Sequence, residues 1–276
     1  MSLFKKIAIV GTGLIGGSLA LVIKKNNLAQ RVVGFSRRKE TIAQALKAGI
    51  IDEGSQDLNI IKGADFVILA TPVDVILDLA PQIAKIIGKD AIVTDVGSTK
   101  EKIVSKLDKI FANFIGSHPL AGSEKRGVAN AKCQIFQNSL CILTPTKKSK
   151  GAIVKKVKKF WKSTGANIAT LDSAKHDKVL GFVSHLPHVV AFSLMSSVPK
   201  EHLKFAASGL RDSTRIAGSD AEVWSEIFLS NQKNLLKCIG DFEKNILKLK
   251  SAIRRKDKKA INLILAQAKK KREALK

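Results

Sequence analysis

Hydrophobic and polar positions follow two different patterns along this chain. Between residues 6 and 172, short β-branched runs such as 6–10, 32–35, 65–70 and 91–96 alternate with segments in which apolar residues recur every three or four positions. The short runs predict buried strands, and the longer spacing predicts amphipathic helices. Strands that alternate with helices are typical of βαβ units, so we predict an α/β fold with a doubly wound parallel sheet.

The remaining elements of this first part follow the same two patterns. Further strands are expected at 114–116, 139–144 and 167–171, and helical segments at 18–25, 39–48, 58–62, 74–87, 101–111 and 152–164. In a parallel α/β sheet, ligands bind beyond the carboxyl ends of the strands. Candidate site residues are therefore sought where each strand ends.

After Asp172 the strand pattern stops and helical spacing takes over. Apolar residues between Trp224 and Ile253 recur in steps of three and four, which predicts one long amphipathic helix over about 222–254. Because such a helix exceeds the average length of about 11 to 12 residues, we expect it to pack against a partner subunit as well. The chain is thus expected to form two domains, 1–172 and an all-helical 173–276.

A glycine-rich loop follows the first expected strand. The run Gly11-Thr12-Gly13-Leu14-Ile15-Gly16 has the spacing Gly-x-Gly-x-x-Gly, with a strand before it and a helix after it. In that context the glycines let the backbone approach a pyrophosphate, which lies at the helix N-terminus. We expect Gly11, Gly13, Leu14, Ile15 and Gly16 to bind a dinucleotide.

The end of the second strand bears on the choice of dinucleotide. An acidic residue that binds the ribose 2′-hydroxyl is usual there, but this chain has Ser36, Arg37 and Arg38. Without the carboxylate a 2′-phosphate is not repelled, and a guanidinium can bind it with two hydrogen bonds. We therefore expect NADP rather than NAD, with Thr71 and Pro72 at the next strand end also lining the cofactor site.

The segment 116–127 combines a histidine with several other reactive groups. His118 precedes Pro119, which biases it toward an extended backbone, and Ser117, Ser123 and Glu124 lie nearby in sequence. An imidazole titrates near neutral pH and can take a proton from a hydroxyl. His118 is the candidate base, although a loop histidine of this kind can also simply cap a turn.

A second polar cluster is expected in the helical part. It comprises the segments 176–177, 184–188 and 209–215, which contain His176, His185, His188, Arg211 and Arg215. On a helix Arg211 and Arg215 would share a face, and two arginines with two histidines suit a substrate that carries two carboxylates. The alternative is that these histidines are caps or core residues and that the arginines form surface ion pairs.

The net charge of +25 raises the question of a nucleic-acid partner. The lysines are spread along the chain, aromatic residues are not interleaved with them, and there is no tyrosine, so we expect a solvated basic surface and no nucleic-acid or membrane partner. Cys133, Cys141 and Cys238 lack metal-binding spacing, so we expect no metal. Free thiols and an N-terminus without a signal peptide favour a cytoplasmic location.

Several motifs together resemble the prephenate/arogenate dehydrogenases of tyrosine biosynthesis. They are the glycine run 11–16, Thr94-Asp95-Val96-Gly97-Ser98-Thr99-Lys100, Gly116-Ser117-His118-Pro119-Leu120-Ala121-Gly122-Ser123-Glu124, Leu143-Thr144-Pro145-Thr146, Ser184-His185-Leu186-Pro187-His188 and Arg211-Asp212-Ser213-Thr214-Arg215-Ile216-Ala217. The resemblance covers nearly the whole chain.

This resemblance implies a Rossmann domain at 1–172 and an all-helical substrate-binding and dimerisation domain at 173–276. The implied reaction is oxidative decarboxylation of prephenate to 4-hydroxyphenylpyruvate with NAD or NADP, by a homodimer. By position, His118 matches the catalytic histidine and Ser98 a serine that orients it, while Arg215 matches a carboxylate-binding arginine. His188, Ser123, Glu124 and Arg211 are the other residues expected to line the substrate pocket.

Three alternatives remain open at this stage. Arogenate differs from prephenate by an ammonium in place of a keto group, which one or two pocket residues can discriminate. A β-hydroxyacid dehydrogenase would need a catalytic lysine followed shortly by an asparagine, and here Lys233 and Asn234 are adjacent. A regulatory protein that binds nucleic acid or senses NADP would need a docking element, which the sequence does not show.

Overall fold

The computed structural model describes residues 2–122 and 127–275. Within them a single sheet has the strand order β3-β2-β1-β4-β5-β6-β7-β8. The strands are β1 Phe4–Val10, β2 Ala29–Phe35, β3 Glu53–Ser55, β4 Phe66–Leu69, β5 Ile92–Asp95, β6 Phe114–Pro119, β7 Leu140–Thr144 and β8 Asn167–Thr170. The order of the first six matches the Rossmann fold, in which the sheet reverses direction of growth between β1 and β4.

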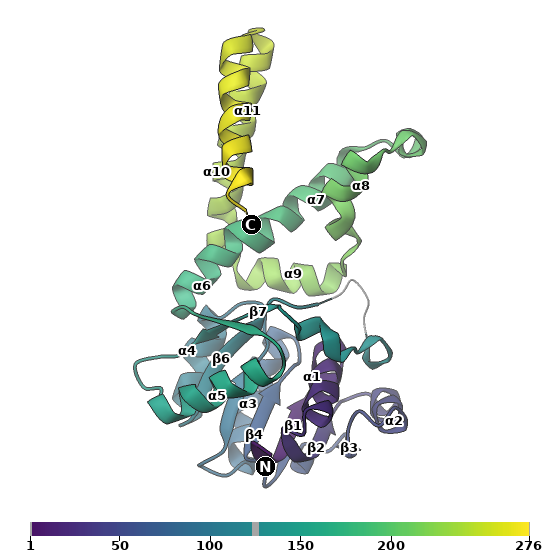
Figure 1. Cartoon of the computed structure of the whole chain (residues 1–276), viewed down its shortest axis with the longest axis vertical. Coiled ribbons are helices and arrows are strands. Elements are labelled where there is room, and N and C mark those ends of the chain that lie inside the picture. Colours follow the sequence, from purple (N-terminus) through teal and green to yellow (C-terminus); the bar gives the residue numbers. More distant parts are fainter. Residues whose placement is uncertain (1, 123–126, 276) are drawn as a thin grey trace. The chain divides into compact units, whose positions relative to one another are not determined.

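The helices connect these strands and then continue alone (Figure 1). The α-helices are α1 Leu14–Lys25, α2 Lys39–Lys47, α3 Val73–Ile86, α4 Glu101–Ile110, α5 Gly151–Ser163, α6 Ser173–Leu180, α7 Leu186–Ser197, α8 Ser208–Thr214, α9 Ala221–Ser230, α10 Gln232–Arg254 and α11 Lys258–Glu273. Short helical turns are η1 Leu58–Ile61, η2 Val128–Asn130, η3 Cys133–Phe136, the π-helical η4 Gly181–His185, η5 Lys200–Phe205 and η6 Arg215–Gly218.

Both faces of the sheet are buried at its centre, which explains the consecutive apolar residues 7–10 of β1 and 66–69 of β4. Ile7 and Ile9 of β1 belong to one core cluster, together with residues of α1 and α5 such as Phe160. Ala8 and Val10 of the same strand belong to a second cluster, together with residues of α3 and α4. Because successive strand side chains point to opposite faces, a sheet covered on both sides needs apolar residues at every position. The predicted doubly wound α/β fold is confirmed.

The last two strands differ in direction from the prediction of a parallel sheet. β7 pairs antiparallel with β6, and β8 pairs parallel with β7. The pairing aligns His118 with Ile142 and extends β6 to Pro119, three residues beyond the predicted strand end. His118 therefore lies inside a strand, with only 7% of its surface exposed.

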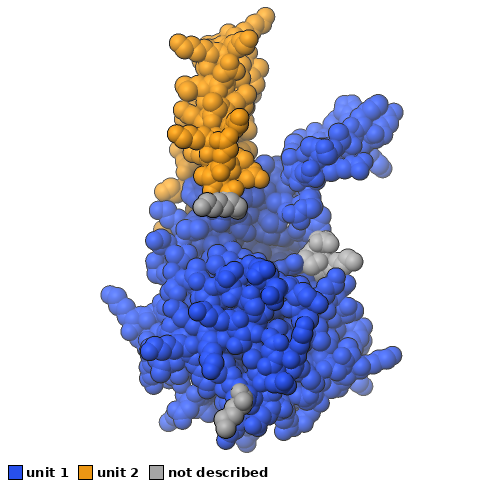
Figure 2. Space-filling model, viewed as in Figure 1, with its two compact units in different colours: residues 1–231 blue, residues 232–276 orange. Residues whose placement is uncertain are grey.

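Residues 1–231 form one compact unit and residues 232–276 a second (Figure 2). The prediction of one helix over 222–254 is wrong, since α9 ends at Ser230 and α10 begins at Gln232. Asn231 between them leaves helical geometry, with φ −111° and ψ 27°. Its buried side chain donates hydrogen bonds to the backbone oxygen of Asp177 and to Nδ1 of His185. These bonds to distant residues replace the continuation of the helix.

The helical segment Ser173–Ser197 is long and apolar enough to cross a membrane by length and composition, a test that core helices of water-soluble proteins also pass. It comprises α6, the π-turn η4 and α7 in direct succession. His176, Asp177 and His185, which lie on this segment, are buried and hydrogen-bonded inside the protein.

Candidate active site

The glycine loop between β1 and α1 has no room for side chains at two positions. A Cβ atom on Gly16 would lie 1.9 Å from the backbone oxygen of Gly11. Gly11 has φ +102°, and a Cβ there would lie 2.7 Å from the backbone oxygen of Ala70. The loop thus brings the backbone of β1, the N-terminus of α1 and the end of β4 into close contact, as a pyrophosphate site requires.

The residues around this loop fit a dinucleotide. Gly13 precedes the first residue of α1, whose N-terminal N–H groups attract a phosphate. The hydroxyl oxygens of Thr12 and Thr71 are buried and have no hydrogen-bond partner among the described residues. An unpaired buried hydroxyl is costly, so a polar ligand at this edge would satisfy both.

The end of β2 presents two exposed arginines at the same edge of the sheet. Arg37 and Arg38 are exposed, and Ser36 is half-buried. The Ser36 hydroxyl accepts a hydrogen bond from the backbone N–H of Arg38 at 3.2 Å, and Gln56 donates to the backbone oxygen of Arg37 at 2.7 Å. These bonds hold the turn and leave both guanidinium groups directed to its surface.

A buried ion pair fixes the end of β5. Lys100 Nζ contacts Asp95 Oδ2, and both side chains are 0% exposed. Asp95 also accepts hydrogen bonds from the backbone N–H of Gly97 at 2.8 Å and of Ser117 at 3.2 Å. The Asp95 carboxylate therefore connects the loop that carries half-buried Ser98 with Ser117 of β6, the residue before His118.

Ser117, the neighbour of His118, has a structural role on the opposite face of β6. The Thr94 hydroxyl donates to the backbone oxygen of Ile115, so it accepts from the Ser117 hydroxyl at 2.7 Å. Ser117 Oγ in turn accepts from the indole N–H of Trp161 at 3.0 Å. This hydrogen-bonded cluster holds the strand that carries His118.

His118 begins a line of hydrogen bonds into α6. Its Nδ1 lies 2.9 Å from Nε2 of His176, and Nδ1 of His176 lies 2.8 Å from Oδ1 of Asp177. The Asp177 carboxylate also accepts from the backbone N–H groups of Lys100 and Glu101, at 2.7 and 2.9 Å. It thereby caps the N-terminus of α4, where the first N–H groups lack partners within the helix.

Burial keeps these imidazoles neutral. Burial, the neighbouring His176 and the charge of Lys100 hold the pKa of His118 well below its ordinary value of 6.5. Burial also lowers the pKa of His176, although its hydrogen bond to Asp177 acts in the opposite direction. A neutral imidazole can accept a proton, so His118 has the protonation state that a general base needs near neutral pH.

The π-helical turn η4 separates α6 from α7 and places two further histidines. Burial lowers the pKa of His185 to about 4, and its Nδ1 accepts from Asn231 at 3.0 Å. His188 donates from Nδ1 to the backbone oxygen of Ser184 at 3.0 Å and stacks on Trp224 with ring centroids 3.3 Å apart. Single π-turns inside helices are frequent at functional sites.

Arg215 lies close enough to His188 for its charge to help lower the pKa of that imidazole, after the larger effect of burial. The structure thus brings together His188 and Arg215, two residues expected to bind substrate. Arg211 and Arg215 are both exposed, but α8 ends at Thr214 and Arg215 begins the turn η6. The two arginines therefore do not share one regular α-helix. Ser123 and Glu124, also expected in the pocket, lie outside the described residues.

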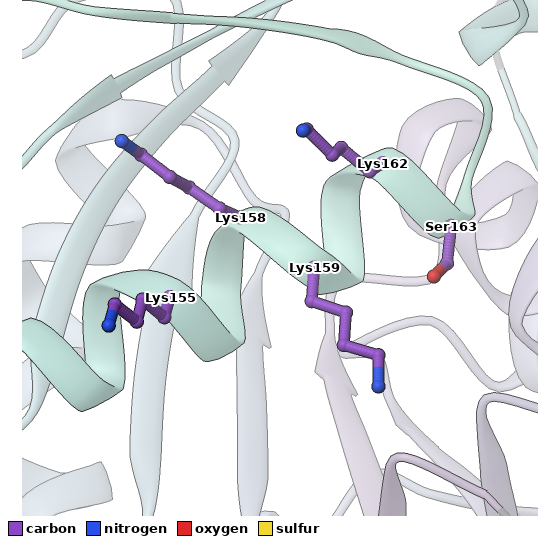
Figure 3. Close-up of a pocket in the computed structure, with 5 residues that line it drawn as sticks. All are labelled: Lys155, Lys158, Lys159, Lys162 and Ser163. Carbon is purple, nitrogen blue, oxygen red and sulfur yellow. The ribbon is translucent and has the colours of Figure 1, made fainter.

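The lysines of α5 line a hollow that contains none of the expected site residues. The hollow, of about 400 Å³, is lined by Lys155, Lys158, Lys159, Lys162 and Ser163 (Figure 3). The lysine side chains point in different directions along the helix, and none of the expected site residues lies among them. In residues 2–122 and 127–275, no three His, Cys, Asp or Glu side chains gather as metal ligands would.

Two family models match the chain. The model described as prephenate dehydrogenase, nucleotide-binding domain, matches residues 19–170, and the prephenate dehydrogenase dimerization domain matches residues 172–267. The chain belongs to the prephenate dehydrogenase family. It is also 38% identical to prephenate dehydrogenase of Bacillus subtilis over 98% of this chain and 76% of that protein. The protein is therefore an oxidoreductase with a nicotinamide cofactor.

Solved structures of the prephenate dehydrogenase family extend the likeness to three dimensions. The structure of prephenate dehydrogenase from Aquifex aeolicus in complex with hydroxyphenyl propionate and NAD+ has a TM-score of 0.93 and 37% identity, covering 99% of this chain and 98% of that one. Arogenate dehydrogenase from Synechocystis has a TM-score of 0.84 and 30% identity, covering 97% and 99%. The two neighbours have different substrates in their names, so the fold alone does not choose between them.

Sequence reasoning missed several residues that this prephenate dehydrogenase family member uses to build the site. Trp224 was considered only as part of a periodic apolar face, yet it stacks on His188. Lys100 and Asn231 were not candidates, although they bind Asp95 and His185. Asn231 is a polar residue within a helical pattern, which periodicity treats as an interruption, whereas Lys100 is the last residue of the motif that begins at Thr94.

Proposed function

We propose that this protein catalyses the oxidative decarboxylation of prephenate to 4-hydroxyphenylpyruvate. The supporting observation is the position of His118, on β6 at the sheet edge that carries the glycine loop, with its Nδ1 hydrogen-bonded to His176. The nicotinamide supplies the acceptor for the hydride that leaves ring carbon 4. His118 takes the proton of the 4-hydroxyl, the ring carboxylate leaves as CO2, and its bonding electrons complete the aromatic ring. The phenolate oxygen formed in this way takes a proton back, which gives the hydroxyl of the product.

The remaining residues have simpler roles in this proposal. Arg215 and His188 hold the side-chain carboxylate, which is supported by the effect of the Arg215 charge on the pKa of His188. Ser98 orients His118 and the substrate hydroxyl, and Ser123, Glu124 and Arg211 complete the pocket. Because loss of CO2 makes the ring aromatic, these residues need only position the reacting groups and accept one proton.

A direct test measures reduction of the nicotinamide with purified protein, prephenate or arogenate, and NAD or NADP. We expect turnover of prephenate, reduced about 100-fold or more in His118→Asn as for the loss of a general base. His202→Asn is the matched control, since His202 is exposed on η5. Turnover of arogenate alone would favour the second candidate, for which the Synechocystis relative gives the precedent. Absence of turnover with either substrate would refute the proposal.

We propose NADP as the preferred cofactor because exposed Arg37 and Arg38 follow β2 where an acidic residue would favour NAD. The ratio of kcat/KM for NADP to that for NAD should exceed one and should fall in Arg37→Ala and Arg38→Ala. Lys47→Ala, an exposed cation on α2, should leave the ratio unchanged. A wild-type preference for NAD would refute this assignment.

We further propose a cytoplasmic homodimer with domains 1–172 and 173–276. The division is supported by the end of the sheet at Thr170 and by the boundary between the two family models. The helices of the second unit expose Leu236, Leu247 and Leu263, which a partner subunit would cover. Light scattering should give twice the chain mass of 29.9 kDa, and a monomer would contradict the proposal.

A further inference from the structure

Hydrogen-bond direction can be followed from Asp177 outward. Its carboxylate accepts from the backbone N–H groups of Lys100 and Glu101, and such groups only donate. We take the carboxylate, which already holds these two donors, as the acceptor in its bond to His176 too. The nitrogen 2.8 Å from Oδ1, His176 Nδ1, must therefore carry a hydrogen.

The same reasoning fixes the next link. A neutral imidazole carries one hydrogen, so His176 Nε2 has a lone pair and accepts. His118 Nδ1, 2.9 Å away, is then the donor, and the hydrogen of the neutral His118 ring is on Nδ1. Its second nitrogen, Nε2, is left as the basic one.

We propose that His176 and Asp177 are positioning residues for the reaction, which hold His118 in the tautomer whose Nε2 accepts the substrate proton. This inference rests on the proposed function, because it assigns a role within the same proton transfer. The line of bonds also orients the ring, since His118 on β6 is connected through His176 to a carboxylate fixed at the N-terminus of α4.

The line also stabilises the proton once it is transferred. After transfer, His118 is a cation in a buried site. The site contains Lys100, which precedes α4, Asp95 of β5, Cys141 of β7, and His176, Asp177 and His185 of the helical segment. The Lys100 charge opposes protonation of His118, although Lys100 is paired with Asp95. The Asp177 carboxylate raises the pKa of His176, and in this proposal it favours protonation of His118 through the His176 ring.

The tautomer can be observed without any turnover. The chain has five histidines, so the imidazole nitrogens of protein labelled with ¹⁵N-histidine give few signals and can be assigned by single substitutions. We expect both His118 and His176 of the wild-type protein to be protonated at Nδ1 and unprotonated at Nε2. A His118 protonated at Nε2 would overturn the inference.

Two variants at position 176 separate positioning from folding. His176→Gln keeps a side-chain oxygen able to accept from His118 Nδ1, whereas His176→Leu removes every acceptor. In both, Asp177 keeps its bonds to the backbone of Lys100 and Glu101. We expect His176→Leu to shift His118 toward the Nε2-protonated form and to lower kcat about 100-fold with little change in KM, and His176→Gln to restore part of both losses.

The outcomes distinguish this inference from the proposed function. Full turnover by His176→Leu, within twofold of wild type, would overturn the positioning role even if prephenate is the substrate. If the wild-type protein does not turn over prephenate, the proposed function fails, and the ¹⁵N signals still decide the tautomer. Should His176→Leu not fold, the kcat of His176→Gln and the wild-type spectrum decide the matter. His202→Gln, at an exposed histidine, should change neither readout.

Discussion

Replacing Lys100 with methionine should cost this protein a large part of its stability. Methionine fills nearly the same volume as the lysine stem but removes the ammonium that pairs with Asp95. Both partners are 0% exposed, so water cannot take the place of the lost charge. Asp95 would keep only its bonds to the backbone N–H groups of Gly97 and Ser117. Breaking one partner of a buried pair typically costs about 3 to 5 kcal/mol.

That cost is large compared with the total stability of a folded protein, which is about 5 to 15 kcal/mol. For a protein of this size, about 2 to 4 °C of Tm are lost for each kcal/mol, so Tm should fall by roughly 10 °C. Urea denaturation followed by circular dichroism measures the free energy of unfolding. Lys102→Met, at an exposed position in the first turn of α4, is the matched control and should change this free energy by less than about 0.5 kcal/mol.

The double variant Lys100→Met/Asp95→Asn tests the reasoning more sharply. Because most of the cost arises from an unpaired buried carboxylate, neutralising Asp95 as well should recover about half of the loss or more. If Lys100→Met destabilises by less than about 1 kcal/mol, or if the two single costs simply add, the buried pair does not act as described.

Three further predictions concern pH and the cofactor loop. Because the pKa of His118 is well below 6.5, kcat/KM should stay constant as pH falls through 6.5 and decline only at lower pH; a decline centred at or above 6.5 would contradict this. Folding lowers the pKa of His185 to about 4, so below pH 6.5 the unfolded chain takes up a proton at this residue before the folded protein does. The contribution of His185 to the free energy of unfolding is therefore fully present above pH 6.5 and is lost as pH falls toward 4. Between pH 7 and 5 this histidine alone should cost about 2 kcal/mol of unfolding free energy, a difference that urea titrations should find absent in His185→Gln. Gly16→Ala, whose Cβ would lie 1.9 Å from the Gly11 oxygen, should abolish dinucleotide binding by calorimetry, whereas Gly88→Ala, with nothing within 4 Å, should bind normally.

Local patterns predicted the elements of the sheet, because each strand or helix is defined by residues close in sequence. The glycine loop was equally readable, since its spacing and flanking elements lie within one βα unit. The direction of β7 could not be predicted, because a strand has the same side-chain period in either direction. The break at Asn231 was also hidden, because its reason is a pair of hydrogen bonds to Asp177 and His185, 54 and 46 residues away.

In the site, too, the residues within one segment could be predicted, whereas hydrogen bonds between residues far apart in the sequence could not. His118 could be named as the base from its own segment, but the histidine that orients it lies 58 residues later. Asp177 reaches back 77 residues to the backbone of Lys100, and the Lys100 side chain reaches Asp95 at the end of β5. The N-terminus of α4 thus connects Asp95 at the end of β5 with Asp177, the carboxylate that is hydrogen-bonded to His176. A substitution that shifts α4 should therefore impair catalysis even where it contacts neither cofactor nor substrate.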